Sequence, residues 1–301
     1  MPQKPSADVR IDASLVRRLL TQAGDAYADL EIAKASEGWD CEVWRLGARL
    51  AMRMPRRAAA AVLVAHEHAA LPLVGPAIEA TGVRVPTPVF LGHAAEDYPW
   101  AWSIVPWIDG VSGLEVPRAE RGGWTQPLAH ALAALHVVAP DDAPANPVRG
   151  VPFAQRDAAV TARFRSLRAH GGWPVSLLDA AESAWRSGME APAWRAAPLW
   201  VHGDLHPGNL VARGGGLAGI IDFGDVTAGD PAYDLGIAWL AFAERDRDAF
   251  RAATDDRYDA ATWVRARAWA AAVAVLLASH SDDDEDFLTM AGETLHEVSL
   301  G

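Results

Sequence analysis

Three side chains that carry oxygen, Asp204, Asn209 and Asp222, are spaced so that they can meet in one place. Glycines and a proline force the segment 203–209 into a loop. Residues 210–221 then form a hairpin around three glycines, and a hairpin of that length returns Asp222 to the side of Asn209. Two carboxylates and an amide are therefore expected to converge.

These groups suit phosphoryl transfer. One carboxylate can orient an attacking hydroxyl and accept its proton, while the amide oxygen and the second carboxylate hold Mg²⁺ on the nucleotide phosphates. A hydrolase-type zinc site is the alternative, because His202 and His206 are four residues apart. Gly203 and Pro207 oppose the helix that such a pair needs. A plain acidic hairpin would not explain where Asn209 lies.

The pattern H-x-D-x-x-x-x-N followed by D-F-G resembles the catalytic loop and metal-binding motif of kinases. The version here, HGDLHPGN, then IDFGD, then GDPAYDL, is similar to the aminoglycoside phosphotransferase family. That family includes aminoglycoside and macrolide kinases and relatives that act on choline, homoserine or methylthioribose. The resemblance implies Asp204 as the catalytic base, Asn209 and Asp222 as magnesium ligands, and His202 as a brace for the loop.

The same resemblance gives roles to four more residues. It implies that Asp230 and Asp234 support the catalytic loop, one of them as a helix cap. Asp225 is either another acidic group near the metal or a solvated turn residue. His206 either approaches substrate or phosphate, or only orients the Pro-Gly step that follows it.

The phosphate-binding loop of a protein kinase, G-x-G-x-x-G, is absent, and the turn 36–40 stands in its place. Ser36 and the backbone around Gly38 are the expected phosphate neighbours, and an ordinary hairpin turn is the alternative. Pro106 lacks an N–H group, so an adenine bound at the connection between the lobes would pair with Val105 or Trp107. Either residue could instead belong to the core.

The lysine that contacts the α- and β-phosphates in kinases is missing. Of 27 basic residues only Lys4 and Lys34 are lysines, and neither follows the turn. We expect Arg53 to replace it, with Glu67 of the next helix as its ion-pair partner. A polar helix face is the other interpretation of Glu67. If Arg53 fails in this role, the chain is a nucleotide-binding pseudokinase.

Only a few residues separate D-F-G from the Gly-Asp-Pro segment at 229–231. This spacing leaves no room for a peptide-docking loop, so it favours a small-molecule acceptor. An acidic run near the C-terminus either holds ammonium groups, as in aminoglycoside kinases, or forms a solvated loop; its site candidates are Asp282, Asp283, Asp284 and Glu285. Trp263, Trp269 and Tyr258 form either an apolar wall for a macrolide or part of the core.

The surrounding pattern predicts an α+β protein with two lobes, and the family resemblance implies that they form a protein-kinase-like fold. Residues 1–107 alternate helices with short strands, as expected for a β-rich nucleotide-binding lobe with a mostly antiparallel sheet. Here we expect a helix over about 58–71 and two short strands over 85–91 and 101–107. Residues 108–301 are mainly helical around a β-like island at 199–223, as expected for the catalytic and substrate-binding lobe. The helices expected in its second half lie near 234–245, 259–279 and 285–298.

Composition narrows the class further. A net charge of −12 argues against nucleic acid as a partner. We expect no membrane span and no secretory signal, and Cys41, the single cysteine, excludes an internal disulfide, so a cytoplasmic location is the simplest interpretation. The expected activity is Mg²⁺-dependent transfer from ATP or GTP to a hydroxyl of an aminoglycoside. The alternatives are a macrolide kinase, a metabolic kinase and a pseudokinase.

Overall fold

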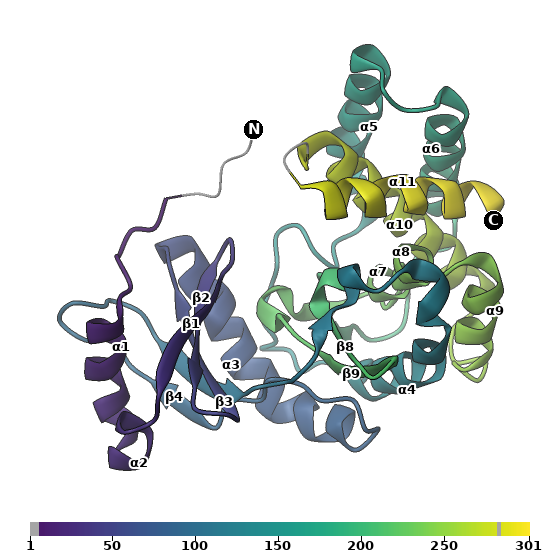
Figure 1. The fold of residues 1–301 in the computed structure, drawn as a ribbon. Helices are drawn as coiled ribbons and strands as arrows, with labels where there is room; N and C mark the ends of the chain where they lie inside the picture. Colours follow the sequence, from purple (N-terminus) through teal and green to yellow (C-terminus); the bar gives the residue numbers. More distant parts are fainter. Residues whose placement is uncertain (1–5, 282–283) are drawn as a thin grey trace.

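The structure, a computed structural model, describes residues 6–281 and 284–301. Its N-terminal lobe holds an antiparallel sheet with the strand order β1-β2-β3-β5-β4 (Figure 1). The strands are β1 (Ile32–Glu37), β2 (Cys41–Leu46), β3 (Leu50–Pro55), β4 (Phe90–Gly92) and β5 (Trp102–Pro106). A small sheet-based lobe followed by a helical lobe confirms the predicted fold class.

Helices cover this sheet. On its outer side lie α1 (Ala13–Leu20), the 3₁₀ turn η1 (Thr21–Ala23) and α2 (Asp25–Ala28). The buried face of α1 packs into an apolar cluster with Trp44, Met52 and Ile104 of the strands. Helix α3 (Ala58–Glu79) lies between the sheet and the larger lobe (Figure 1). It therefore links the strand that carries Arg53 to the catalytic half of the molecule.

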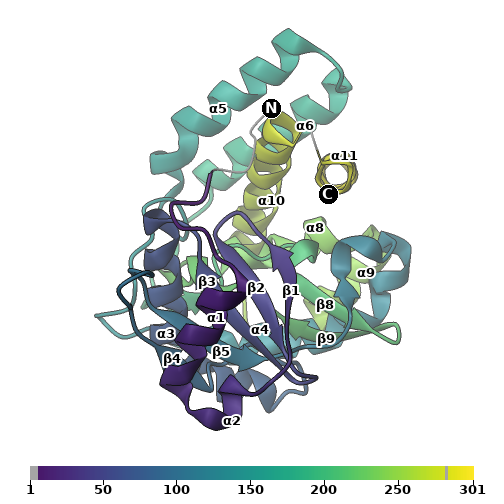
Figure 2. The same cartoon turned by 60° about the vertical axis from the view of Figure 1, so that its left-hand side comes forward.

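The C-terminal lobe is built mainly from helices (Figure 2). The α-helices are α4 (Thr125–Leu135), α5 (Phe153–His170), α6 (Val175–Glu190), α7 (Ala232–Leu235), α8 (Ile237–Ala241), α9 (Glu244–Ala252), α10 (Ala260–His280) and α11 (Glu285–Leu300). Two 3₁₀ segments, η2 (Gly113–Glu115) and η3 (Arg118–Trp124), precede α4. Helix α10 packs against α5, α6, α7 and α11, so it forms the centre of the lobe.

Short strands and turns position the catalytic loop. Strand β8 lies between β6 and β9, and β7 pairs with β10. Their bounds, with those of two 3₁₀ turns, are β6 (Val111–Ser112), β7 (Leu199–Val201), η4 (Pro207–Asn209), β8 (Leu210–Arg213), β9 (Gly216–Ile220), η5 (Phe223–Asp225) and β10 (Thr227–Gly229). The predicted hairpin is therefore β8–β9, and it does bring the two ends of the motif together.

Several predicted bounds were wrong. Ser36 belongs to strand β1 rather than to a turn, and the strand expected over 85–91 is ordered as β4 only from Phe90. The helix expected over 58–71 runs on through two prolines to Glu79, because buried residues beyond Leu71 hold it against the core. The helix expected over 234–245 is divided among α7, α8 and α9.

Two helices of the described chain, α3 and α10, are long and apolar enough to cross a membrane by length and composition alone. Both pack against other elements of the fold, α3 against β3, α4 and η5 and α10 against neighbouring helices. Their apolar character is therefore accounted for by core packing.

Candidate active site

The catalytic loop starts where β7 ends, and Asp234 anchors it. The carboxylate of Asp234 is fully buried and accepts hydrogen bonds from the N–H groups of His202 (2.6 Å) and Gly203 (3.0 Å). It also lies 3.1 Å from Nε2 of His136, a buried histidine whose other ring nitrogen contacts the hydroxyl of Tyr258. The support role expected for Asp234 thus has a concrete geometry, and His136 is a partner that sequence reasoning missed.

Replacing Asp234 by asparagine should lower the stability of the folded protein. The change removes the charge from a buried acceptor of two backbone N–H groups, so we expect the free energy of unfolding to fall by about 2–3 kcal/mol. Urea denaturation measures this, with Asp248→Asn, an exposed carboxylate on α9, as the matched control. Equal midpoints for the two variants would contradict the anchoring role.

His202 connects the catalytic loop to the segment that precedes the D-F-G motif. Its Nδ1 accepts a hydrogen bond from the N–H of Asp204 (3.2 Å), so the proton sits on Nε2, which donates to the carbonyl of Ile221 (3.0 Å). Asn209 donates from Nδ2 to the carbonyl of Asp204 (2.8 Å). This leaves its Oδ1 with no hydrogen-bond partner in the described chain, so it is available to a cation.

Asp204 carries an ionised carboxylate. Burial raises its pKa, but Arg149 and His206 more than offset burial and hold the pKa of Asp204 well below its usual range. Arg149 Nη2 lies 2.7 Å from Oδ1, and His206 Nε2 lies 3.7 Å from Oδ2. A carboxylate kept ionised and oriented by a guanidinium is suited to accept a hydrogen bond from an incoming hydroxyl.

Arg149 is a second site residue that sequence reasoning missed. It lies in the irregular segment between α4 and α5, and Asn146 holds that segment by accepting the N–H of Arg149 (3.0 Å). Besides Asp204, its guanidinium contacts the hydroxyl of Tyr233 (2.8 Å) and Oδ2 of Asp225 (3.5 Å). Asp225 is therefore a partner of Arg149 and not a solvated turn residue.

Arg53 reaches both lobes. Its Nη2 lies 3.1 Å from Oε2 of Glu67 and 3.2 Å from Oδ1 of Asp222. Asp222 has a left-handed backbone, with φ of 64°, and its side chain is 55% exposed. The partner expected from sequence, Glu67, is in place, and the contact with Asp222 adds a cross-lobe connection to a candidate metal ligand.

Glu67 should make stability depend on pH. Burial outweighs the attraction of Arg53 and raises the pKa of Glu67 to about 7. The folded state then holds a proton that the unfolded chain, with its pKa near 4.5, releases. Stability from this group is complete below pH 4.5 and falls as pH rises to about 7, by about 1–3 kcal/mol in all. Unfolding of Glu67→Gln across this range should lack that fall; parallel curves for the two proteins would contradict it.

The tip of the β1–β2 turn faces the catalytic carboxylates. Burial and the nearby negative charges of Asp222 and Asp204 raise the pKa of Asp40, although Arg57 opposes them from 2.7 Å. Gly38 donates its N–H to the carbonyl of Cys41 (2.9 Å), while Ser36 is exposed on β1. Of the two predicted phosphate neighbours, Gly38 therefore lies in the turn, while Ser36 lies near the end of strand β1.

The connection between the lobes differs from expectation in its hydrogen bonds. The N–H of Trp107 donates to the carbonyl of Arg49 (2.8 Å), and its ring lies 4.1 Å below the guanidinium of Arg45. Val105 lies two residues before Trp107 and pairs with Ala51 of β3. Because hydrogen-bonded pairs recur every second residue in an antiparallel ladder, the N–H of Val105 also points toward β3. A nucleotide base could use either N–H only by displacing a sheet bond.

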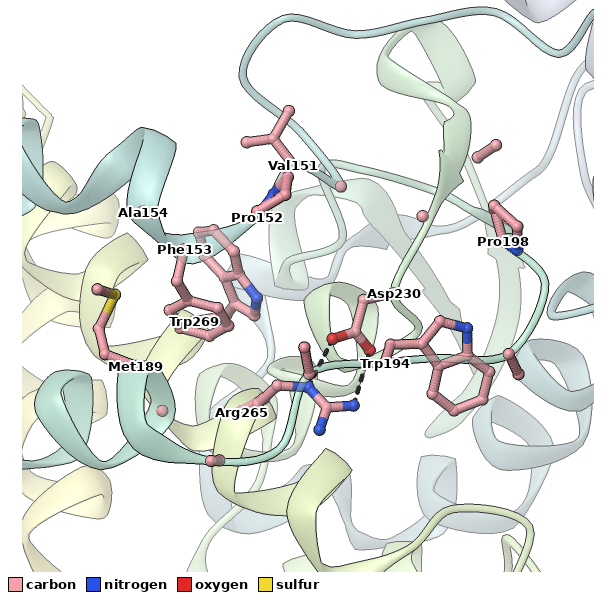
Figure 3. A pocket seen from close by; sticks show the side chains of 17 residues that line it. Val151, Pro152, Phe153, Ala154, Met189, Trp194, Pro198, Asp230, Arg265 and Trp269 are labelled. Carbon is pink, nitrogen blue, oxygen red and sulfur yellow. Dashed lines mark hydrogen bonds and ion pairs between the residues drawn. The ribbon is translucent and has the colours of Figure 1, made fainter.

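Asp230 lies apart from the reacting groups. It forms a two-point ion pair with Arg265, at 2.6 and 3.2 Å, and accepts the N–H of Ala232 at the start of α7. Figure 3 shows this pair at a cavity of about 460 Å³. Trp269, which is largely buried, also lines this cavity, while Trp263 and Tyr258 lie in the core.

The start of α11 lies beside the catalytic loop. The ring of Phe287 meets His206 edge-on at 5.5 Å, and His206 Nδ1 accepts the N–H of Gly208 (3.0 Å). Asp284 caps α11 by accepting the N–H of Phe287, and Glu285 is in the first turn. The other two acidic candidates, Asp282 and Asp283, lie outside the described residues.

A β-rich lobe above a helical lobe, with Asp204, Asn209 and Asp222 at their junction, defines a kinase-type phosphotransferase. The chain belongs to the phosphotransferase enzyme family (APH), whose model matches residues 31–269. No curated protein matches it by sequence.

Solved structures share the fold at low sequence identity. The GDP and kanamycin complex of APH(2")-IIia is 19% identical, with a TM-score of 0.67, and the match covers 96% of this chain and 99% of that one. A macrolide 2'-phosphotransferase type I is 19% identical, with a TM-score of 0.61 and coverage of 97% and 99%. The ADP-bound APH(2'')-Ib is 18% identical, with a TM-score of 0.59 and coverage of 95% and 98%.

Proposed function

We propose that this protein is a Mg²⁺-dependent kinase that transfers the γ-phosphoryl group of ATP or GTP to a hydroxyl of a small molecule. The observation that carries the proposal is Asp204, an ionised carboxylate held 2.7 Å from Arg149 on a loop that Asp234 anchors. Solved neighbours with bound GDP or ADP support a nucleotide site in this fold.

In the proposed reaction, Asp204 orients the acceptor hydroxyl and takes its proton as the new O–P bond forms, while the bond from the γ-phosphorus to the β–γ bridging oxygen breaks and the nucleoside diphosphate leaves. Asn209 and Asp222 would hold Mg²⁺, because Oδ1 of Asn209, unpaired in the described chain, and the exposed carboxylate of Asp222 offer the hard oxygen ligands this ion prefers. When bound, Mg²⁺ would neutralise charge on the phosphates. Arg53, steadied by Glu67, would contact the α- and β-phosphates in place of the usual lysine. Catalysis would rest on positioning and charge neutralisation.

The first acceptor to test is an aminoglycoside. In support, the acidic first turn of α11 lies next to His206 through Phe287, where it can meet ammonium groups. A macrolide is the second candidate, since one solved neighbour is a macrolide kinase. In either case we propose a cytoplasmic enzyme, because ATP and GTP are available there.

Coupled detection of nucleoside diphosphate tests this proposal. ATP and GTP with Mg²⁺ would be offered with aminoglycosides, macrolides, and amino, acidic or sugar alcohols. Saturable turnover with one class supports the kinase proposal and identifies the acceptor. Nucleotide binding without turnover on any acceptor would instead favour the pseudokinase alternative.

A further inference from the structure

Beside the catalytic carboxylate lies a small cavity whose charged residues are all arginines. It holds about 20 Å³, room for one water-sized group such as an oxygen of an anion, and lies between α5 and α10. Arg149 lines this cavity and also contacts Asp204, so the cavity and the catalytic centre share a wall. Its lining residues are Arg149, Arg156, Val160, Arg163, Tyr233, Trp269, Ala272, Val273 and Leu276.

Two of these arginines have no counter-charge. Arg156 and Arg163 are seven residues apart and share a face of α5. Neither forms an ion pair with a carboxylate of residues 6–281 or 284–301, and Nε of Arg163 is buried without an acceptor. Elsewhere on the same helix, Arg168 pairs with Asp179 and Glu182. Among the half-buried arginines of α5, the two that line the cavity are therefore the ones without a carboxylate partner in the described chain.

Uncompensated guanidinium groups that are partly removed from water favour an anion. Burial and the charge of Arg156 lower the pKa of Arg163, as expected for two cations that face the same space. Arg149 differs, because Asp204 and Asp225 already neutralise it. A purely cationic acceptor would leave Arg156 and Arg163 unpaired and would be repelled on this side of the site.

We propose that the acceptor carries a carboxylate or phosphate group, which docks on Arg156 and Arg163 while its hydroxyl reaches Asp204. This inference rests on the proposed kinase function and narrows its substrate class to anionic or zwitterionic alcohols. The two guanidinium forks can each engage an anion through paired N–H groups. An ammonium group on the same acceptor would lie toward α11.

Binding to the nucleotide-loaded protein tests the anion site. The protein is saturated with Mg²⁺ and a non-hydrolysable ATP or GTP analogue, so that added anions cannot enter the nucleotide site. Glucuronate, glucose 6-phosphate, glucose and glucosamine are then titrated by calorimetry. They share one sugar ring and differ in charge, and the first two distinguish a carboxylate from a phosphate. We expect an anionic sugar to bind at least about tenfold more tightly than glucose or glucosamine.

The preference must depend on the two arginines. Arg156→Gln/Arg163→Gln should reduce it by about tenfold or more, while Arg165→Gln, an exposed change on the same helix, should leave it intact. Equal or weaker binding of both anionic sugars, or a preference that survives the double substitution, would overturn the anion site. If the analogues themselves do not bind, the proposed kinase function fails and the anion site fails with it.

Discussion

Asp204→Ala should lose nearly all phosphoryl transfer, by about 10²–10⁴-fold in kcat, because no other group is positioned to take the proton of the acceptor hydroxyl. Asp204 contacts Arg149 and His206, whereas Arg53 lies against Glu67 and Asp222. Nucleotide affinity should therefore change little. Steady-state turnover and nucleotide titration on the same preparation measure the two effects separately.

Two further variants separate proton transfer from charge. Asp204→Asn keeps the shape of the side chain but not its basicity, so its loss should match that of the alanine variant. Asp225→Asn weakens the other acidic contact of Arg149 and is the matched control, with a smaller expected loss. Turnover of Asp204→Asn within about tenfold of the unaltered protein would contradict the assignment of a general base.

Asp222→Asn is expected to have the second large effect, with turnover reduced by about 10³-fold. The substitution removes the negative charge proposed to hold Mg²⁺ and the cross-lobe contact at 3.2 Å from Arg53. Asparagine is chosen because Asp222 has a φ of 64°, which asparagine tolerates better than alanine. The remaining turnover of Asp222→Asn should need Mg²⁺ concentrations well above those that saturate the unaltered protein.

The same Asp-to-Asn change at another residue with a positive φ controls for any effect of the backbone conformation. Asp256 is exposed and also has a positive φ, of 53°, so Asp256→Asn repeats the substitution far from any proposed ligand. It should leave both turnover and Mg²⁺ dependence unchanged. An Asp222→Asn protein with the same Mg²⁺ dependence as Asp256→Asn would show that Asp222 holds no metal.

The part of the site that the sequence predicted is the part encoded locally. Asp204 and Asn209 lie on one loop, and the β8–β9 hairpin determines where Asp222 returns, so spacing alone was informative. The Arg53–Glu67 contact followed from one strand and the next helix. In the same way, the alternation of short strands and helices was enough to predict a two-lobed α+β fold.

Long-range contacts were not predictable in this way. Arg149 precedes its partner Asp204 by 55 residues and His136 precedes its partner Asp234 by 98, in a region that no sequence motif marks. The N–H of Trp107 was expected to be free, but a sheet bond to Arg49 takes it up. These contacts depend on how helices and strands pack, which neither periodicity nor spacing records.

The charged residues around the proposed acceptor site were likewise only partly predictable from the sequence. The acidic run before α11 is visible in the sequence because its residues are adjacent. Arg156 and Arg163, by contrast, look like ordinary exposed residues of a helix until α10 closes the cavity beside them. The sequence therefore directed attention to a cationic acceptor, and the folded structure adds a place for an anionic group.

Mass spectrometry of the acceptors after incubation with ATP or GTP and Mg²⁺ tests the proposed phosphoryl transfer directly. We expect one acceptor to gain the mass of a single phosphoryl group with the unaltered protein, and Asp204→Asn or omission of Mg²⁺ to abolish the gain. A phosphorylated product that forms equally well with Asp204→Asn, or without Mg²⁺, would contradict the proposal.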